Sequence, residues 1–171
     1  MPKKQQKALV GIVMGSDSDL PVMTETARML EELGVPSELE IASAHRSPDR
    51  ASDYARSADR RGIRVIVAGA GGAFHLAGFI AAHTVLPVIA VPLGNSPLNG
   101  LDSLLATVQM PGGVPVAVMG IGKSGAVNAA IFAAQILATA DESLRQRLAQ
   151  YKEKLARQVA DKNTRLRQES L

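Results

Sequence analysis

The sequence contains no cysteine and no tryptophan, and only 3% of its 171 residues are aromatic. Disulfides, thiolate nucleophiles and thiolate metal sites are therefore excluded. The shortage of aromatic rings also argues against a flavin held between aromatic side chains and against a surface that stacks nucleic-acid bases. Hydrophobic residues still make up 46% of the chain, so its core must be built from Ala, Val, Ile, Leu and Met.

Long hydrophobic runs are also missing. No apolar stretch reaches the ~20 residues that cross a bilayer without a Gly, Pro or polar interruption. The N-terminal segment MPKKQQKALVGIVMG lacks the long apolar region and the small-residue cleavage site of a signal peptide. We therefore expect a soluble, cytoplasmic protein that has no membrane partner.

The net charge of +3 is unevenly distributed. The basic head, residues 1–7, and residues 141–171 together carry +6, so residues 8–140 carry −3. A mildly acidic body with few aromatics is a poor nucleic-acid surface, and we expect no nucleic-acid partner. A metal site is not expected either, because the three histidines, His45, His75 and His83, show no HxxxH or HxH spacing.

Short apolar runs alternate with amphipathic stretches along the whole chain. Strands are expected at 8–15, 38–41, 64–72, 87–92 and 114–120, and helices at 18–33, 48–61, 75–84, 101–109, 124–139 and from 141 onward. Continuous β-branched runs are typical of a parallel sheet covered on both faces. Only the second strand alternates, with Leu39 and Ile41 between glutamates, as an edge strand does.

This pattern predicts one α/β domain, residues 1–171, with three layers in a doubly wound arrangement. The five-stranded parallel sheet is expected to be flavodoxin-like, and a C-terminal helix is added to it. The head, residues 1–7, and the charged tail from about 160 to 171 are expected to be flexible. In such folds ligands bind beyond the carboxyl ends of the strands, which here are the turns at 15–19, 43–47, 69–75, 92–100 and 120–125.

The first of these turns reads GSDSD and contains Ser16, Asp17 and Asp19. Hydroxyls and backbone N–H groups at a helix N-terminus favour an anion such as phosphate. The simpler interpretation is a capping cluster with Ser18 as the N-cap, since Ser and Asp are common caps. Both interpretations remain open for this turn taken alone.

The second turn, SAHRSP, places Ser43, His45 and Arg46 at the end of an apolar strand. Arginine suits bidentate binding of phosphate, and imidazole can give and take a proton near neutral pH. A capped loop with a structural histidine is the alternative. Ser47 is expected as the cap of the next helix, with Pro48 in its first position.

The third turn, AGAGGAFHL, combines small residues with His75. Glycines at 69, 71 and 72 let a flat ligand approach the backbone, although they do not form the GxGxxG fingerprint of dinucleotide binding. A tight strand-to-helix connection is the plain alternative. Taken together, the turns indicate an α/β enzyme for a small phosphorylated substrate, with His45 as the proton carrier.

The segments VMGSDSD, SAHRSPD, AGAGGAFHLAG and GLDSLLATVQMPGGVPVAV together resemble the class I N5-carboxyaminoimidazole ribonucleotide mutases, the PurE family of purine biosynthesis, over residues 8–140. The resemblance implies an ATP-independent isomerase without cofactor or metal. It would move a carboxylate from nitrogen to carbon by decarboxylation and recarboxylation, giving 4-carboxy-5-aminoimidazole ribonucleotide. It also implies a homo-octamer whose active sites are shared between subunits.

The same resemblance assigns roles to single residues. His45 would be catalytic, as the proton shuttle. The substrate-binding residues would be Ser16, Asp17, Asp19, Ser43, Ala44, Arg46, Ala70, Gly71, Gly72, His75 and Leu76. Within this set the phosphate would lie on Ser16, Ser43 and Arg46, the ribose hydroxyls on Asp19, and carbon dioxide against residues 70–76.

Three positions depart from the family pattern: Leu20 stands where Trp is frequent, Phe74 where Ala is usual and Ala77 where Pro is usual. Phe74 adds bulk beside the expected pocket. Two alternatives to the mutase remain. One is a class II enzyme that carboxylates aminoimidazole ribonucleotide directly, although such enzymes resemble SAHK rather than SAHR. The other is a non-catalytic nucleotide-binding module.

Overall fold

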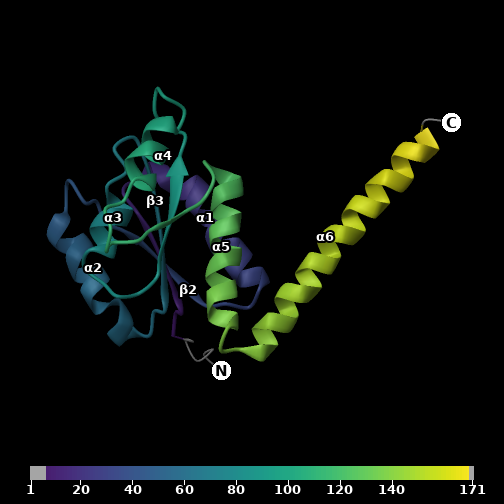
Figure 1. The fold of residues 1–171 in the computed structure, drawn as a ribbon, viewed down its shortest axis with the longest axis horizontal. Helices are drawn as coiled ribbons and strands as arrows, with labels where there is room; N and C mark the ends of the chain where they lie inside the picture. The colour runs from purple at the N-terminus through teal and green to yellow at the C-terminus, as the bar shows by residue number, and fades with distance from the viewer. Residues whose placement is uncertain (1–6, 170–171) are drawn as a thin grey trace.

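The computed structural model describes residues 7–169 (Figure 1). Its sheet contains five parallel strands: β1 (Val10–Met14), β2 (Ser37–Ile41), β3 (Val65–Gly71), β4 (Val88–Leu93) and β5 (Ala117–Val118). They lie in the order β2-β1-β3-β4-β5. This order is that of a flavodoxin-like doubly wound sheet, so the predicted fold class is confirmed.

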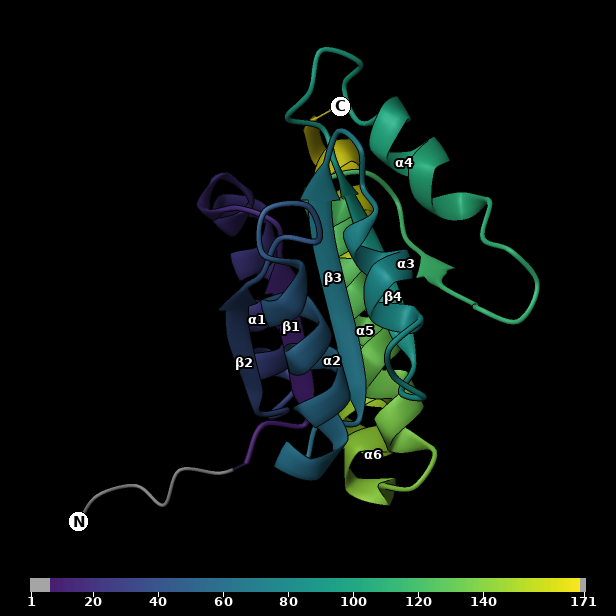
Figure 2. The same cartoon turned by 90° about the vertical axis from the view of Figure 1, so that its left-hand side faces the viewer.

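Helices cover both faces of the sheet (Figure 2). They are α1 (Leu20–Glu32), α2 (Pro48–Arg61), α3 (Leu76–Ala81), α4 (Leu101–Val108), α5 (Lys123–Ala138) and α6 (Glu142–Glu169). One face carries α1, α5 and the start of α6, and the other carries α2 and α3. Because successive strand residues point to opposite faces, Ile12 belongs to the first core and Val13 to the second.

Helix α5 is rich in alanine, and its small side chains let it pack close to its neighbours without large aromatic side chains between them. Six of its alanines are buried, namely Ala126, Ala129, Ala130, Ala133, Ala134 and Ala138. Their small side chains let α5 pack against α1, where the buried hydroxyl of Thr26 donates a 3.0 Å hydrogen bond to the carbonyl of Ala126. The core of a chain with so few aromatic rings is thus closed by helices that lie close together.

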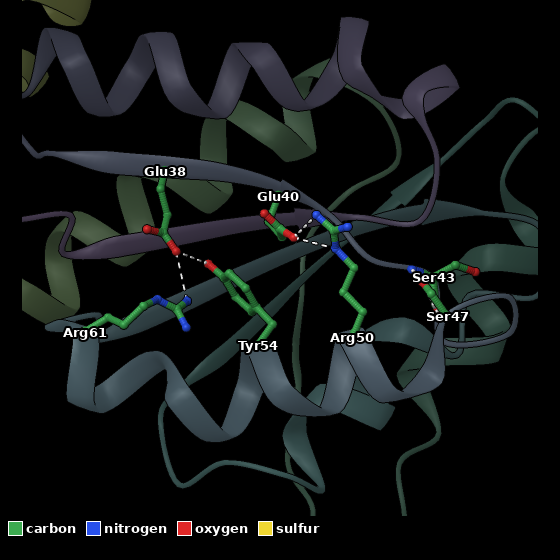
Figure 3. A network of polar contacts seen from close by, with 7 residues as sticks. All are labelled: Glu38, Glu40, Ser43, Ser47, Arg50, Tyr54 and Arg61. Atoms are coloured by element: carbon green, nitrogen blue, oxygen red, sulfur yellow. Dashed lines mark hydrogen bonds and ion pairs between the residues drawn. The ribbon is translucent and has the colours of Figure 1, made fainter.

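Strand β2 lies at one edge of the sheet, and its two glutamates face α2 (Figure 3). Glu38 accepts hydrogen bonds from the hydroxyl of Tyr54 and the guanidinium of Arg61, both 2.9 Å long. Arg50 donates to Glu40 at 2.7 Å. Burial raises the pKa of the Tyr54 phenol, which keeps it a hydrogen-bond donor. Polar contacts therefore attach α2, and the turn before it, to the sheet edge.

Strand β5 is shorter than the predicted 114–120. It pairs with β4 only through Ala117 and Val118, plus a backbone hydrogen bond from Met119 to the carbonyl of Ala90. The predicted start contains Pro115, which has no N–H to donate to the ladder. The preceding glycine at 113 has φ 96°, which is turn geometry rather than strand geometry.

Helix α6 extends through residues 160–169 and projects away from the body of the domain (Figure 1). Leu144 and Leu148 are buried against α5, whereas residues 152–169 are exposed. The charged tail is therefore helical up to Glu169, and its flexibility stays a prediction. Residues 1–6 of the basic head lie outside the described residues. Within the described part, no helix is long and apolar enough to cross a membrane.

Candidate active site

A cavity of about 400 Å³ lies at the carboxyl edge of the sheet, where the turns after β1, β2, β3 and β4 meet. It includes the switch point between β1 and β3, where ligands bind in this fold. Its lining consists of Gly15, Ser16, Ser18, Asp19, Ser43, Ala44, His45, Arg46, Ala70, Gly71, Gly72, Ala73, Leu76, Asn95, Ser96 and Pro97. Three turns chosen from the sequence thus form one site.

The turn after β2 is held by two serines (Figure 3). The hydroxyl oxygen of Ser43 accepts hydrogen bonds from the backbone N–H groups of His45 and Arg46, at 3.3 and 3.1 Å. Ser47 occupies the predicted N-cap position before Pro48, but its hydroxyl turns back to Ser43, accepting from its N–H and donating to its carbonyl. The turn is fixed internally, and the side chains of His45 and Arg46 line the cavity.

His45 and His75 meet although 30 residues separate them in the chain. The Nε2 of His45 lies 2.8 Å from the Nδ1 of His75, with the two ring planes at 83°. A hydrogen bond at this distance needs a proton on one nitrogen and a lone pair on the other. His75 itself does not line the cavity, and it contacts the lining through the ring of His45.

The turn after β1 forms a 3-10 turn, Asp17–Asp19, before α1 begins at Leu20. The prediction of Ser18 as the N-cap of this helix is wrong, because Asp19 occupies the N-cap position of α1 without a side-chain cap bond. Ser16 caps the preceding 3-10 turn, and its hydroxyl accepts from the N–H of Ser18. Ser16 has the extended backbone of an N-cap, and its own N–H donates to Asp19 in a capping box. Asp17 does not line the cavity; it lies in a neighbouring shallow hollow and accepts a hydrogen bond from the hydroxyl of Ser16.

Asp19 is the buried acid of the site, with only 3% of its surface exposed. One carboxylate oxygen accepts from the N–H of Ser16 at 3.0 Å, and the other from the side-chain amide of Asn95 at 2.9 Å. Burial raises the pKa of this carboxyl above its ordinary value, while the bonds from Asn95 and Ser16 and the charge of Arg46 oppose that rise.

The guanidinium of Arg46 reaches across from the second turn to the first. It donates a 3.3 Å hydrogen bond to the carbonyl of Gly15. This contact places a permanent positive charge beside the hydroxyls of Ser16 and Ser43, all of which line both the cavity and a neighbouring shallow hollow that contains Asp17. A cation among hydroxyls at two helix starts suits a phosphate group.

Phe74 does not add bulk to the cavity. It is 1% exposed and lies in the second core together with Ala77. The two residues that differ from the family pattern here are therefore buried beneath the third turn and pack in the core. The carbonyl of Phe74 accepts a hydrogen bond from the buried hydroxyl of Thr107 in α4. Leu20, by contrast, is 42% exposed outside the cavity.

The turn after β4 contributes residues for which the sequence indicated no role. Asn95, Ser96 and Pro97 line the cavity, and Asn95 contacts Asp19. The rule that ligands bind beyond the carboxyl ends of strands already includes residues 92–100, and applying it to each polar residue of that turn would have found Asn95. Within residues 7–169, no cluster of three or more potential metal ligands occurs.

The chain is similar to one protein family and to several named proteins. The family model of AIR carboxylase matches residues 9–158. An N5-carboxyaminoimidazole ribonucleotide mutase of Pyrococcus horikoshii is 56% identical over 95% of this chain and 91% of its own, and one of Bacillus subtilis is 54% identical over 92% and 98%. The crystal structure of Treponema denticola PurE superposes with a TM-score of 0.82 at 26% identity, covering 93% of this chain and 98% of that chain.

Proposed function

The chain belongs to the AIR carboxylase family, and from this membership we infer that it is an N5-carboxyaminoimidazole ribonucleotide mutase, an isomerase of purine biosynthesis. The observation that carries the assignment is the identity of 54–56% to mutases that match nearly the full length of this chain. The expected product is 4-carboxy-5-aminoimidazole ribonucleotide.

The polar turns support a binding mode for this ribonucleotide. The phosphate lies against Arg46 and the hydroxyls of Ser16 and Ser43, because the side chain of Arg46 lines the cavity and carries a permanent positive charge. Ser43 uses its oxygen to accept two backbone hydrogen bonds, so its O–H remains available to donate. Asp19 accepts from the ribose hydroxyls, and Asp17 supports the phosphate turn from outside.

The proton transfers are proposed for His45 by elimination among the lining residues. Arg46 does not release its proton in proteins, and Asp19 is already held by two donors. When the bond between the exocyclic nitrogen and its carboxylate breaks, carbon dioxide leaves and the electron pair stays on nitrogen, which takes a proton from His45. Carbon four then attacks carbon dioxide, and the neutral imidazole takes the proton from carbon four, which restores His45.

Small and apolar residues at the end of β3 support retention of carbon dioxide between these steps. Ala70, Gly71, Gly72 and Leu76 line the cavity on this side, next to Ala44 of the second turn. A bound substrate that covers this lining would keep water and bulk bicarbonate away from the released fragment. His75 shapes the same side by holding the imidazole of His45.

The enzyme is further proposed to be a cytoplasmic homo-octamer with active sites shared between subunits, and to need no cofactor, metal, membrane or nucleic acid. Exposed apolar side chains support an assembly: Leu101, Leu105 and Val108 lie along α4, and Leu155 and Val159 lie on the projecting part of α6. A monomer in water would leave both apolar stripes uncovered. Sedimentation analysis of the full chain tests this assembly.

Direct carboxylation of aminoimidazole ribonucleotide is the second candidate, because the matching family model carries the name AIR carboxylase. A two-substrate assay separates the two activities. The purified protein is given either N5-carboxyaminoimidazole ribonucleotide or aminoimidazole ribonucleotide with bicarbonate, in both cases without ATP. The mutase assignment expects rapid product formation from the first substrate; product from the second alone would replace the mutase by the carboxylase.

A further inference from the structure

The loop between β4 and α4 contributes one side chain to the site that the proposed proton transfers leave unused. Asn95 donates its side-chain N–H to a carboxylate oxygen of Asp19 at 2.9 Å, across 76 positions of the chain. The other oxygen of Asp19 accepts from the backbone of Ser16 at 3.0 Å. Both oxygens of this buried carboxylate are therefore held, one by its own turn and one by a loop from a different strand.

The carboxamide of Asn95 fits only because β3 ends in glycine. A Cβ atom at position 71 would overlap the Oδ1 of Asn95 and lie 2.8 Å from its Cγ. The amide group thus lies across the bare backbone of Gly71, in space that any other residue would fill. One carboxamide joins the turns after β1, β3 and β4 at the point where the cavity is lined by all three.

A carboxylate bound through one oxygen can rotate about its Cβ–Cγ bond, whereas one bound through both oxygens has a fixed plane. Each oxygen of Asp19 keeps a second acceptor site after its present bond, and a fixed plane directs these sites together. Two neighbouring hydroxyls on one sugar ring match such a pair of acceptors. The hydrogen bond from Asn95 is charge-assisted and therefore among the stronger bonds a loop can make.

We propose that Asn95 is a positioning residue for the ribose end of the substrate, which acts through Asp19 and sets the preference for a sugar with both hydroxyls. This inference rests on the proposed function, since Asp19 is taken to accept from the ribose of the mutase substrate. It assigns the β4–α4 loop a part in specificity, whereas the proton transfers stay with His45.

Steady-state kinetics of Asn95→Ala, Asp19→Ala and the double variant test the route through Asp19. Loss of one hydrogen bond to a charged group raises KM of Asn95→Ala about 10-fold, with kcat within about threefold of wild type. In the Asp19→Ala background, Asn95→Ala lowers kcat/KM no further. Asn95→Asp, which keeps the size but removes the donor, raises KM at least as much, whereas Asn163→Asp on the projecting part of α6 leaves both constants unchanged.

A substrate analogue that lacks one ribose hydroxyl distinguishes positioning from a purely structural role, because loss of a structural contact would not change the discrimination between substrate and analogue. The wild type discriminates against this analogue, and Asn95→Ala reduces that discrimination severalfold. With an active wild type, additive effects of the two substitutions, a loss in kcat alone, or unchanged discrimination would each overturn the role of Asn95 while leaving the mutase assignment intact. A wild type that does not convert the mutase substrate would remove the proposed function and this inference together.

Discussion

Replacing His45 by asparagine removes the proton carrier and keeps most of the side-chain volume. Positioned proton transfer is worth about 10²–10⁴ in rate, which corresponds to about 3–5 kcal/mol of transition-state stabilisation. His45 is exposed, and the bond from its ring goes to another exposed side chain, His75. Exposed substitutions of this kind change stability by about 0.5 kcal/mol or less, so Tm should move by only about 1–2 °C.

The other two histidines of the chain provide graded controls. His75→Asn removes the partner that orients His45, and loss of one hydrogen bond predicts a decrease of about five- to tenfold in kcat. His83→Asn removes a ring that bonds the carbonyl of Phe79 at 2.7 Å and does not line the cavity. Turnover of this last variant should match that of the wild type.

The assay follows appearance of the carbon-four carboxylate with saturating N5-carboxyaminoimidazole ribonucleotide, next to thermal unfolding and calorimetric binding of the substrate. His45→Asn is expected to bind substrate and to fold like the wild type, while its kcat falls at least 100-fold. Turnover of His45→Asn within threefold of wild type would refute the assignment of His45. A large loss of Tm would instead show that this turn depends on the imidazole for folding.

Three further predictions concern the buried acid, a close backbone approach and the phosphate turn. Burial raises the pKa of the Asp19 carboxyl, so the native state holds this proton more tightly than the unfolded chain, and the unfolding free energy falls as pH rises between the ordinary and the raised pKa. Asp19→Asn should flatten that fall in urea titrations; an unchanged slope would contradict it. Gly125→Ala would drive a Cβ into the backbone carbonyl of Gly120 and should cost about 1–3 kcal/mol of stability in denaturant melts, whereas Gly120→Ala, which meets nothing within 4 Å, should be near neutral. Equal stability of the two variants would contradict the close approach. Arg46→Ala should raise KM about 10- to 100-fold by removing charge-assisted phosphate bonds, and an unchanged KM would place the phosphate elsewhere.

Much of the fold could be predicted because its signals are local. The run before Gly71 is apolar and β-branched as a central strand requires, and α2 begins at Pro48 and ends at Arg61 as predicted. Because ligands in this fold bind beyond the carboxyl ends of the strands, the turns that contain Ser16, His45 and Gly72 could be predicted to line one cavity, as they do. These features depend on periodicity and topology, which a single sequence carries.

Features that depend on contacts between distant segments could not be predicted from the sequence. A lone asparagine in a loop has no periodicity, so nothing at position 95 indicates a partner at position 19. The pairing of His45 with His75 depends on how two turns pack, and the inward path of Phe74 depends on the space beneath α3. The prediction of Ser18 as the N-cap of α1 is wrong because a 3-10 turn, Asp17–Asp19, precedes the helix; Ser16 caps this turn, and Asp19 occupies the N-cap position of α1.

In the proposed reaction one carboxylate moves from nitrogen to carbon inside the cavity, and His45 carries the proton. The direct measurement supplies N5-carboxyaminoimidazole ribonucleotide labelled with ¹³C in its carboxylate, in the presence of excess unlabelled bicarbonate. Carbon dioxide held against the lining at Ala70, Gly71 and Gly72 should be recaptured before it escapes, so most of the product should keep the label. A product whose carboxylate has equilibrated with the unlabelled bicarbonate would contradict the account.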